Sequence, residues 1–65
     1  MQLLLNGAAF DAAEGTTLAD LVRRVELRGR YAIEVNGEIV PRSRYAESLL
    51  QAGDRVEVVQ AVGGG

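Results

Sequence analysis

The chain has 65 residues, of which 48% are hydrophobic, and a net charge of −2. This is enough for one small globular domain, and the absence of cysteine and histidine removes the usual general base and the common soft metal ligands, which argues against an autonomous enzyme. The negative charge has the wrong sign for binding nucleic acid. No apolar run reaches the ~18 residues of a membrane span, and no basic and apolar leader opens the sequence, so we expect a cytoplasmic protein without nucleic-acid or membrane partners.

The N-terminal residues predict a β-hairpin. Two short segments, residues 1–5 and 8–11, are separated by Asn6-Gly7. Asn-Gly favours a type I′ turn, because both central residues of that turn need a positive φ. A short loop over residues 12–16 then leads to the next element.

Thr17 begins the predicted helix. Its hydroxyl can accept a hydrogen bond from the first free amides, and Asp20, three residues later, completes a variant of the capping box. One apolar stripe follows with helical spacing: Leu18, Leu21, Val22 and Val25. We expect Gly29 to end the helix in the left-handed conformation, with Arg28 near the negative end of the helix dipole.

A second hairpin follows the helix. Residues 31–35 predict a strand, and Asn36-Gly37 predicts a tight turn into residues 38–40. Pro41 ends this strand, because it has no amide hydrogen to donate to a sheet.

A short helix and a last strand complete the domain. Residues 43–50 predict one turn of helix that Ser43 caps, held against the core by Tyr45, Leu49 and Leu50. After a turn at Gly53-Asp54, residues 55–61 alternate between apolar and charged side chains, as a half-buried strand does.

This order of elements favours one helix packed on a mixed sheet of about five strands. The first and last strands would lie parallel at the centre of the sheet, with everything between them as the connection. We therefore predict an α+β domain with the ubiquitin-like β-grasp fold over residues 1–61.

The last four residues predict a flexible tail over residues 62–65. Val62 is followed by Gly63, Gly64 and Gly65, and consecutive glycines neither pack nor order readily. Four residues extend at most ~14 Å, so the tail could enter a channel too narrow for larger side chains. It would present a carboxylate with a reference pKa of ~3.5, ionised at neutral pH, which must be activated by transfer of AMP before it can be attacked. The catalytic groups would then belong to a partner enzyme.

Four segments resemble the ThiS family of sulfur carrier proteins: MQLLLNG at residues 1–7, VNGEIVPR at 35–42, GDRVEV at 53–58 and VGGG at 62–65. The resemblance implies that a ThiF-type adenylyltransferase adenylates the Gly65 carboxylate with ATP and magnesium. Sulfur from a cysteine-desulfurase persulfide would then displace AMP. The resulting thiocarboxylate would donate its sulfur to thiazole synthase, ThiG, in thiamine biosynthesis. The carrier itself would bind no cofactor and no metal.

Strand alternation predicts a docking face for these partners. If Leu3 and Leu5 face the helix, Leu4 faces the open side of the sheet, and Val59 and Ala61 join it there. An exposed apolar strip beside the tail could hold a partner enzyme, although simple coverage of the sheet explains these residues equally well.

The remaining charged residues are interpreted as surface residues or as contacts to a partner. The acidic residues Glu34, Glu38, Glu47 and Glu57 have no ligand spacing and are interpreted as solvated surface. Arg42 and Arg44 could pair with acidic groups of a partner or be ordinary surface charge. All seven basic residues are arginine, which reflects either codon composition or the need to keep amines away from a reactive acyl group.

Two other functions stay open at this point. The small subunit of molybdopterin synthase is also a β-grasp carrier with a diglycine end, and its acceptor enzyme would distinguish it. A ubiquitin-like interaction module without acyl chemistry would tolerate residues added after Gly65, whereas a carrier would not. A β-grasp ferredoxin is excluded because no cysteine can bind iron.

Overall fold

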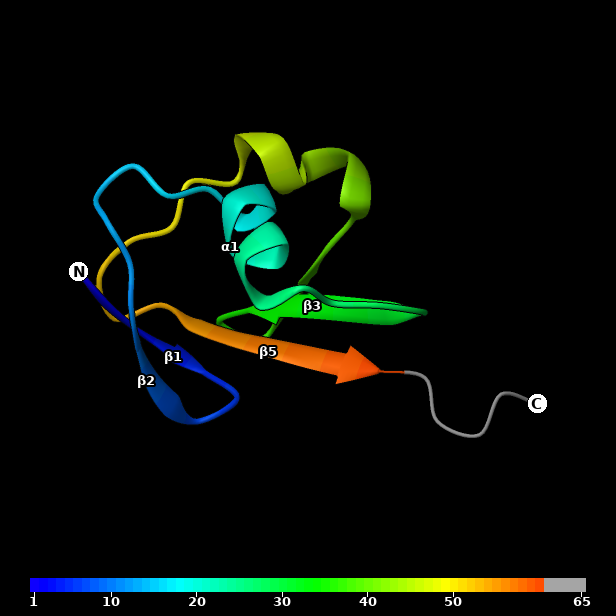
Figure 1. Ribbon diagram of the computed structural model, residues 1–65, viewed down its shortest axis with the longest axis horizontal. Helices are drawn as coiled ribbons and strands as arrows, with labels where there is room; N and C mark the ends of the chain where they lie inside the picture. The colour runs from blue at the N-terminus through cyan, green and yellow to red at the C-terminus, as the bar shows by residue number, and fades with distance from the viewer. Residues whose placement is uncertain (61–65) are drawn as a thin grey trace.

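A computed structural model describes residues 1–60 of the chain. The elements in chain order are β1 (Gln2–Leu5), β2 (Ala8–Asp11), α1 (Leu18–Val25), β3 (Tyr31–Val35), β4 (Glu38–Val40), the 3-10 helix η1 (Arg42–Glu47) and β5 (Arg55–Gln60). The strands form one sheet in the order β2-β1-β5-β3-β4, and α1 and η1 lie together on one side of it (Figure 1). The other side of the sheet carries no helix among the described residues. The predicted α+β sandwich of one main helix on a mixed sheet is confirmed.

The two Asn-Gly turns set the register of both hairpins. Asn6 and Gly7 have φ of 50° and 82°, and Asn36 and Gly37 have φ of 53° and 86°, the paired positive values of a type I′ turn. The predicted parallel pairing at the sheet centre is also present: β1 pairs with β5 through Leu4 opposite Arg55, and β5 pairs antiparallel with β3.

Both turn asparagines also hold β5 in place. The side-chain oxygen of Asn6 accepts a hydrogen bond from the backbone N–H of Val58 at 2.8 Å. The side-chain oxygen of Asn36 accepts one from the N–H of Arg55 at 2.9 Å, and its amide group donates to Asp54 at 3.0 Å. A side chain from each hairpin turn therefore fixes the central strand.

The predicted capping box at the start of α1 is confirmed. The N–H of Asp20 donates to the Thr17 hydroxyl at 3.2 Å, and the N–H of Thr17 donates to the Asp20 carboxylate at 3.0 Å. The bond from the Thr17 backbone, helped by the Thr17 hydroxyl and the positive charge of Arg23, lowers the pKa of Asp20 below its ordinary value.

The predicted helix end was wrong. The helix ends at Val25, and Glu26, with φ of 54° and ψ of 49°, is the left-handed residue that caps it. Leu27 then packs against the core, which requires the chain to leave the helix before Gly29. Gly29 has φ of 74° in the turn that leads to β3, and Arg28 lies beyond the helix rather than in its last turn.

The short helix also differs in detail from its prediction. It is a 3-10 helix that begins after Pro41, so Ser43 lies inside it and caps nothing. Tyr45 and Leu50 are buried as expected, but Leu49 is 59% exposed. Leu49 forms an isolated bridge with Thr17, and in such extended backbone its neighbour Leu50 points inward instead.

The core lies between α1, η1 and the covered face of the sheet. Its buried side chains are Leu3, Ala12, Leu18, Leu21, Ile33, Tyr45, Leu50 and Val56. Every element except the two edge strands β2 and β4 contributes to this set, so the core depends on contacts between distant parts of the chain.

We predict that Leu18→Ala lowers the free energy of unfolding by about 3 kcal/mol, because Leu18 is fully buried and its removal leaves a cavity. Leu49→Ala, which removes the same atoms from an exposed position, should cost far less. Urea denaturation measures both. Equal losses for the two variants would show that the core is not where the structure places it.

Candidate functional site

The site predicted from the sequence lies at and beyond the end of β5. Gln60, the last residue of β5, is in register with Tyr31 at the start of β3. The predicted site residues Ala61, Val62, Gly63, Gly64 and Gly65 lie outside the described residues. The structure therefore describes the strand that precedes these residues, β5, which is the central strand of the sheet.

A small hollow lies at this end of the sheet. Its volume is about 290 Å³, and it is lined by Arg30, Tyr31, Ala32, Val59 and Gln60. The side-chain amide of Gln60 donates a hydrogen bond to the backbone carbonyl of Arg28 at 3.3 Å. The turn before β3 therefore packs beside the end of β5.

The open face of the sheet carries the two described residues of the predicted docking face. Leu4 is 39% exposed and Val59 is 53% exposed, while Leu3 is buried on the other side. Charged residues share this face with Leu4 and Val59, however. Leu4 lies opposite Arg55 at the start of β5, so the charged residue Glu57 stands on the same face between Leu4 and Val59.

Ile39 on β4 is a further apolar residue of this face, and it was missed. Its side chain is 69% exposed. The turn at residues 36–37 places Ile39 opposite Glu34, on the face that Glu34 shares with Val59 and not with Ile33. The signal was available in the sequence, since a two-residue turn fixes the register of the hairpin.

Two glutamates that are far apart in the sequence meet on the open face. Glu34 on β3 is directly opposite Glu57 on β5. Directly opposed residues have Cβ atoms about 4.5–5.5 Å apart, and like charges in such a pair destabilise a sheet. Neither carboxylate forms an ion pair with another residue of the range 1–60. The interpretation of these glutamates as solvated surface without ligand spacing did not include this pairing across the strands.

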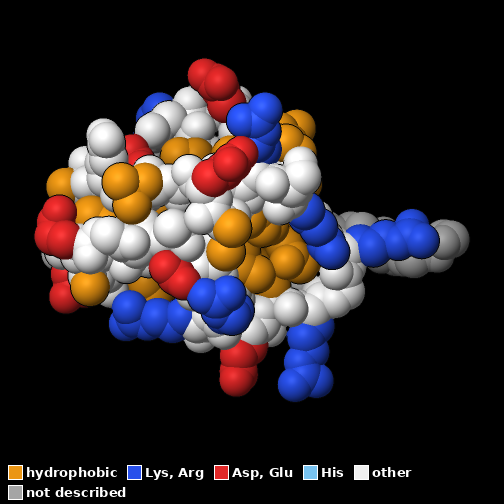
Figure 2. All heavy atoms as spheres, turned by 90° about the horizontal axis from the view of Figure 1, so that it is seen from above, with side chains coloured by type: hydrophobic (Ala, Val, Ile, Leu, Met, Phe, Trp, Pro, Cys, Tyr) orange, Lys and Arg blue, Asp and Glu red, His pale blue; other side chains and the backbone are white. Residues whose placement is uncertain are grey.

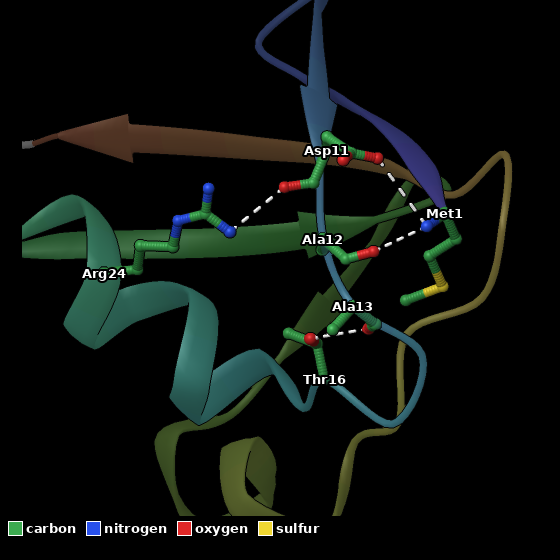
Figure 3. A network of polar contacts seen from close by, with 6 residues as sticks. All are labelled: Met1, Asp11, Ala12, Ala13, Thr16 and Arg24. Carbon is green, nitrogen blue, oxygen red and sulfur yellow. Dashed lines mark hydrogen bonds and ion pairs between the residues drawn. The ribbon is translucent and has the colours of Figure 1, made fainter.

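A separate polar network fastens the opposite end of the sheet (Figure 3). The Met1 nitrogen donates to the carbonyl of Ala12 at 2.6 Å and lies 3.6 Å from the Asp11 carboxylate. The Arg24 guanidinium donates to the carbonyl of Asp11 at 3.0 Å and lies over the Phe10 ring. These contacts tie β2 to β1 and to α1, where β2 is an edge strand.

The described residues hold no assembled centre for metal chemistry. Over residues 1–60, histidine, cysteine, aspartate and glutamate side chains do not gather in groups of three or more. Nor does any helix of that range have the length and apolar character needed to cross a membrane.

The parallel pairing of β1 with β5, the single main helix and the open face define a ubiquitin-like β-grasp domain. A solved structure of a thiamine biosynthesis protein (ThiS) from Geobacter metallireducens superposes with a TM-score of 0.84, at 29% identity and with 100% of both chains covered. The sulfur carrier protein ThiS of Escherichia coli (strain K12) is 35% identical over 66 residues, again with 100% of both chains covered.

Residues 3–65 match the model of the ThiS family, and the chain belongs to this family. It is accordingly a sulfur carrier protein of thiamine biosynthesis. This match favours ThiS over the small subunit of molybdopterin synthase. A thiazole synthase from Paramagnetospirillum magneticum (strain ATCC 700264 / AMB-1) is also 36% identical over 66 residues, and the chain spans 20% of that protein's length.

The opposed glutamates lead to a prediction about stability. Glu34→Gln and Glu57→Gln should each raise the free energy of unfolding by about 0.2–1 kcal/mol at low salt, because each removes the same repulsion. The double variant should gain less than the sum of the two single variants.

Urea denaturation at low and high salt checks this double-mutant cycle. Glu38→Gln is the matched control, since Glu38 lies opposite the apolar residue Val35. Strict additivity of the two substitutions would show that the two carboxylates do not interact.

Proposed function

We propose that this ThiS-family sulfur carrier holds its sulfur as a thiocarboxylate on the carboxyl group of Gly65. The observation that supports this best is the match of residues 3–65 to the family, because it includes the glycine sequence at residues 63–65. The sheet supplies a base for the tail, since β5 pairs with β1 at Arg55 and Val56 and with β3 as far as Gln60. Glycines after such a strand suit entry into a narrow channel of a partner.

The chemistry would be performed by partners in successive steps. A ThiF-type adenylyltransferase would join the Gly65 carboxylate to AMP from ATP, with release of pyrophosphate and with magnesium on the nucleotide. A persulfide that originates from a cysteine desulfurase would then attack the acyl carbon and displace AMP, leaving an acyl disulfide. A thiol of a partner would attack the S–S bond of this acyl disulfide, which releases the thiocarboxylate and leaves the two partner sulfurs joined as a disulfide. No described residue of the carrier needs to act as a base in these steps, consistent with a chain that has no histidine.

Thiazole synthase is the proposed acceptor of the sulfur. Two thiazole synthases are 36% and 38% identical to this chain over 66 residues, so a region like this one forms part of those proteins. The presence of such a region within thiazole synthase chains is consistent with a carrier that binds thiazole synthase when it transfers sulfur.

The open face of the sheet is the proposed docking surface for these partners. It presents Leu4 and Val59, and we add Ile39, whose side chain is the most exposed of the three. Ala61 continues the same alternation in the sequence. Removing these apolar side chains from water on binding would favour association, while the charged residues between them would fix the orientation.

The central prediction concerns the carboxyl group of Gly65. Incubation of the chain with a ThiF-type adenylyltransferase, ATP, magnesium, a persulfide donor and a thiol reductant should replace one oxygen of Gly65 by sulfur. Intact-mass spectrometry followed by fragmentation detects and locates this change.

A variant without Gly64 and Gly65 and a variant with one alanine after Gly65 serve as controls. Both should fold normally and lose the conversion entirely. If either variant still supports growth of cells in medium without thiamine, the result would instead favour an interaction module without acyl chemistry.

Leu4→Glu should lower kcat/KM for adenylation about tenfold or more without unfolding the domain, because it places a charge on a face that must lose water on docking. Leu49→Glu is the matched control, since Leu49 is also exposed but precedes Leu50 on the side of α1 and η1. Adenylation kinetics and thermal unfolding measure the two effects. If both variants are adenylated as fast as the unaltered chain, the open face is not the docking surface.

A further inference from the structure

Three arginines belong to segments that lie beside the end of β5. The carbonyl of Arg28 accepts the hydrogen bond from Gln60, and Arg30 lines the hollow beside Gln60. The Arg42 guanidinium lies over the ring of Tyr31, 4.5 Å from its centroid, and Tyr31 is in register with Gln60. We call Arg28, Arg30 and Arg42 the basic rim. Figure 2 shows basic side chains gathered at the end of the molecule toward which β5 points in Figure 1.

The charge of the basic rim is not balanced within the described part of the chain. All three side chains are exposed, and none forms an ion pair with another residue of the range 1–60. By contrast, Arg44, two residues after Arg42, is paired with Glu47 at 3.3 Å. The chain as a whole carries a net charge of −2, so this end of the molecule has the opposite sign of charge from the chain overall.

We infer that the basic rim docks on a carboxylate-rich surface at the entrance to the active site of the adenylating partner. The inference rests on the proposed function, because it is that reaction that brings a partner to the end of β5. Partner carboxylates would balance the rim and orient the carrier so that the chain beyond Gln60 points into the site. The nucleotide phosphates are a poorer counterpart, because they must lie at the Gly65 carboxyl group, five residues beyond Gln60.

The basic rim consists of arginine and contains no lysine, and this difference affects the chemistry of the tail. The five residues after Gln60 extend at most ~18 Å when straight, and any bend in them brings the activated carboxyl group nearer to the side chains of the rim. A guanidinium stays protonated at neutral pH and is a poor nucleophile. A lysine amine with a reference pKa of ~10.4 is deprotonated, and therefore nucleophilic, for a small fraction of the time. Arginine therefore supplies positive charge without an acyl acceptor, and the chain contains no lysine.

The side reaction that arginine prevents can be written in full. A lysine amine that has lost one proton attacks the acyl carbon of the adenylate. The C–N bond forms, the bond from the acyl carbon to the AMP oxygen breaks, AMP leaves with the electron pair, and the nitrogen loses a second proton. The product is a cyclic amide that differs from the carrier by one water.

Two triple variants test the inference with the ThiF-type adenylyltransferase, ATP and magnesium. R28Q/R30Q/R42Q should raise the KM for the carrier at least ~10-fold at ~0.01 M ionic strength and much less at ~0.15 M, because salt screens the attraction. The KM for ATP should not change. R28K/R30K/R42K should keep the KM for the carrier within ~2-fold but accumulate the cyclic amide, seen by intact mass as the loss of one water.

R44Q and R44K are the matched controls. Arg44 lies on the same 3-10 helix as Arg42, and its exposed ion pair contributes little to stability. Neither control should change the KM for the carrier or form the amide. Thermal unfolding of every variant separates a docking effect from a folding effect, which matters at Arg42 because of its contact with Tyr31.

An unchanged KM for the carrier in R28Q/R30Q/R42Q would overturn the docking role. A raised KM for ATP instead would assign the rim to the nucleotide phosphates and overturn it equally. Absence of the amide from the lysine variant would overturn the reason given for arginine. Failure of the unaltered chain to be adenylated at all would be a different result, because it would remove the proposed function and this inference with it.

Discussion

The structure depends on the parallel pairing of β1 with β5. Two segments from opposite ends of the chain meet at the centre of the sheet, where Val56 is fully buried in the same core as Leu3 and Leu18. The first residues of β5 pair with β1, the whole strand pairs with β3 as far as Gln60, and the side chains of two turn asparagines bind its backbone at Arg55 and Val58. Every feature of the site is placed relative to this strand.

Local sequence patterns predicted most of the fold because they act over few residues. The Asn-Gly turns, the capping box at Thr17 and the stripe on α1 each depend on neighbours in the chain. The errors arose where distant contacts decide the outcome. Leu27 must reach the core, which ends the helix at Glu26 rather than at Gly29, and the bridge between Thr17 and Leu49 turns Leu49 outward.

The sequence predicted which side chains of one strand share a face of the sheet. It did not predict which residues of neighbouring strands lie beside one another. Alternation within β1 placed Leu4 on the open face. The meeting of Glu34 with Glu57, and the gathering of arginines around Gln60, depend on the register of β3 against β5. No tight turn joins these two strands, because β4 and η1 lie between them in the chain, so core packing sets that register and local sequence does not. The open face of β5 therefore carries Arg55 and Glu57 beside apolar residues, whereas segments that contain Arg28, Arg30 and Arg42 lie near the end of the strand.

The central position of β5 also has a mechanical consequence. A partner that grips the chain beyond Gln60 and draws it away applies its load along the strand. The hydrogen bonds to β1 and β3 lie across that direction, so they resist in shear and must give way together, whereas a strand peeled from an edge loses its bonds one at a time. A pull on the end of β5 is therefore opposed by its hydrogen bonds to both neighbouring strands, which a carrier built on an edge strand would lack.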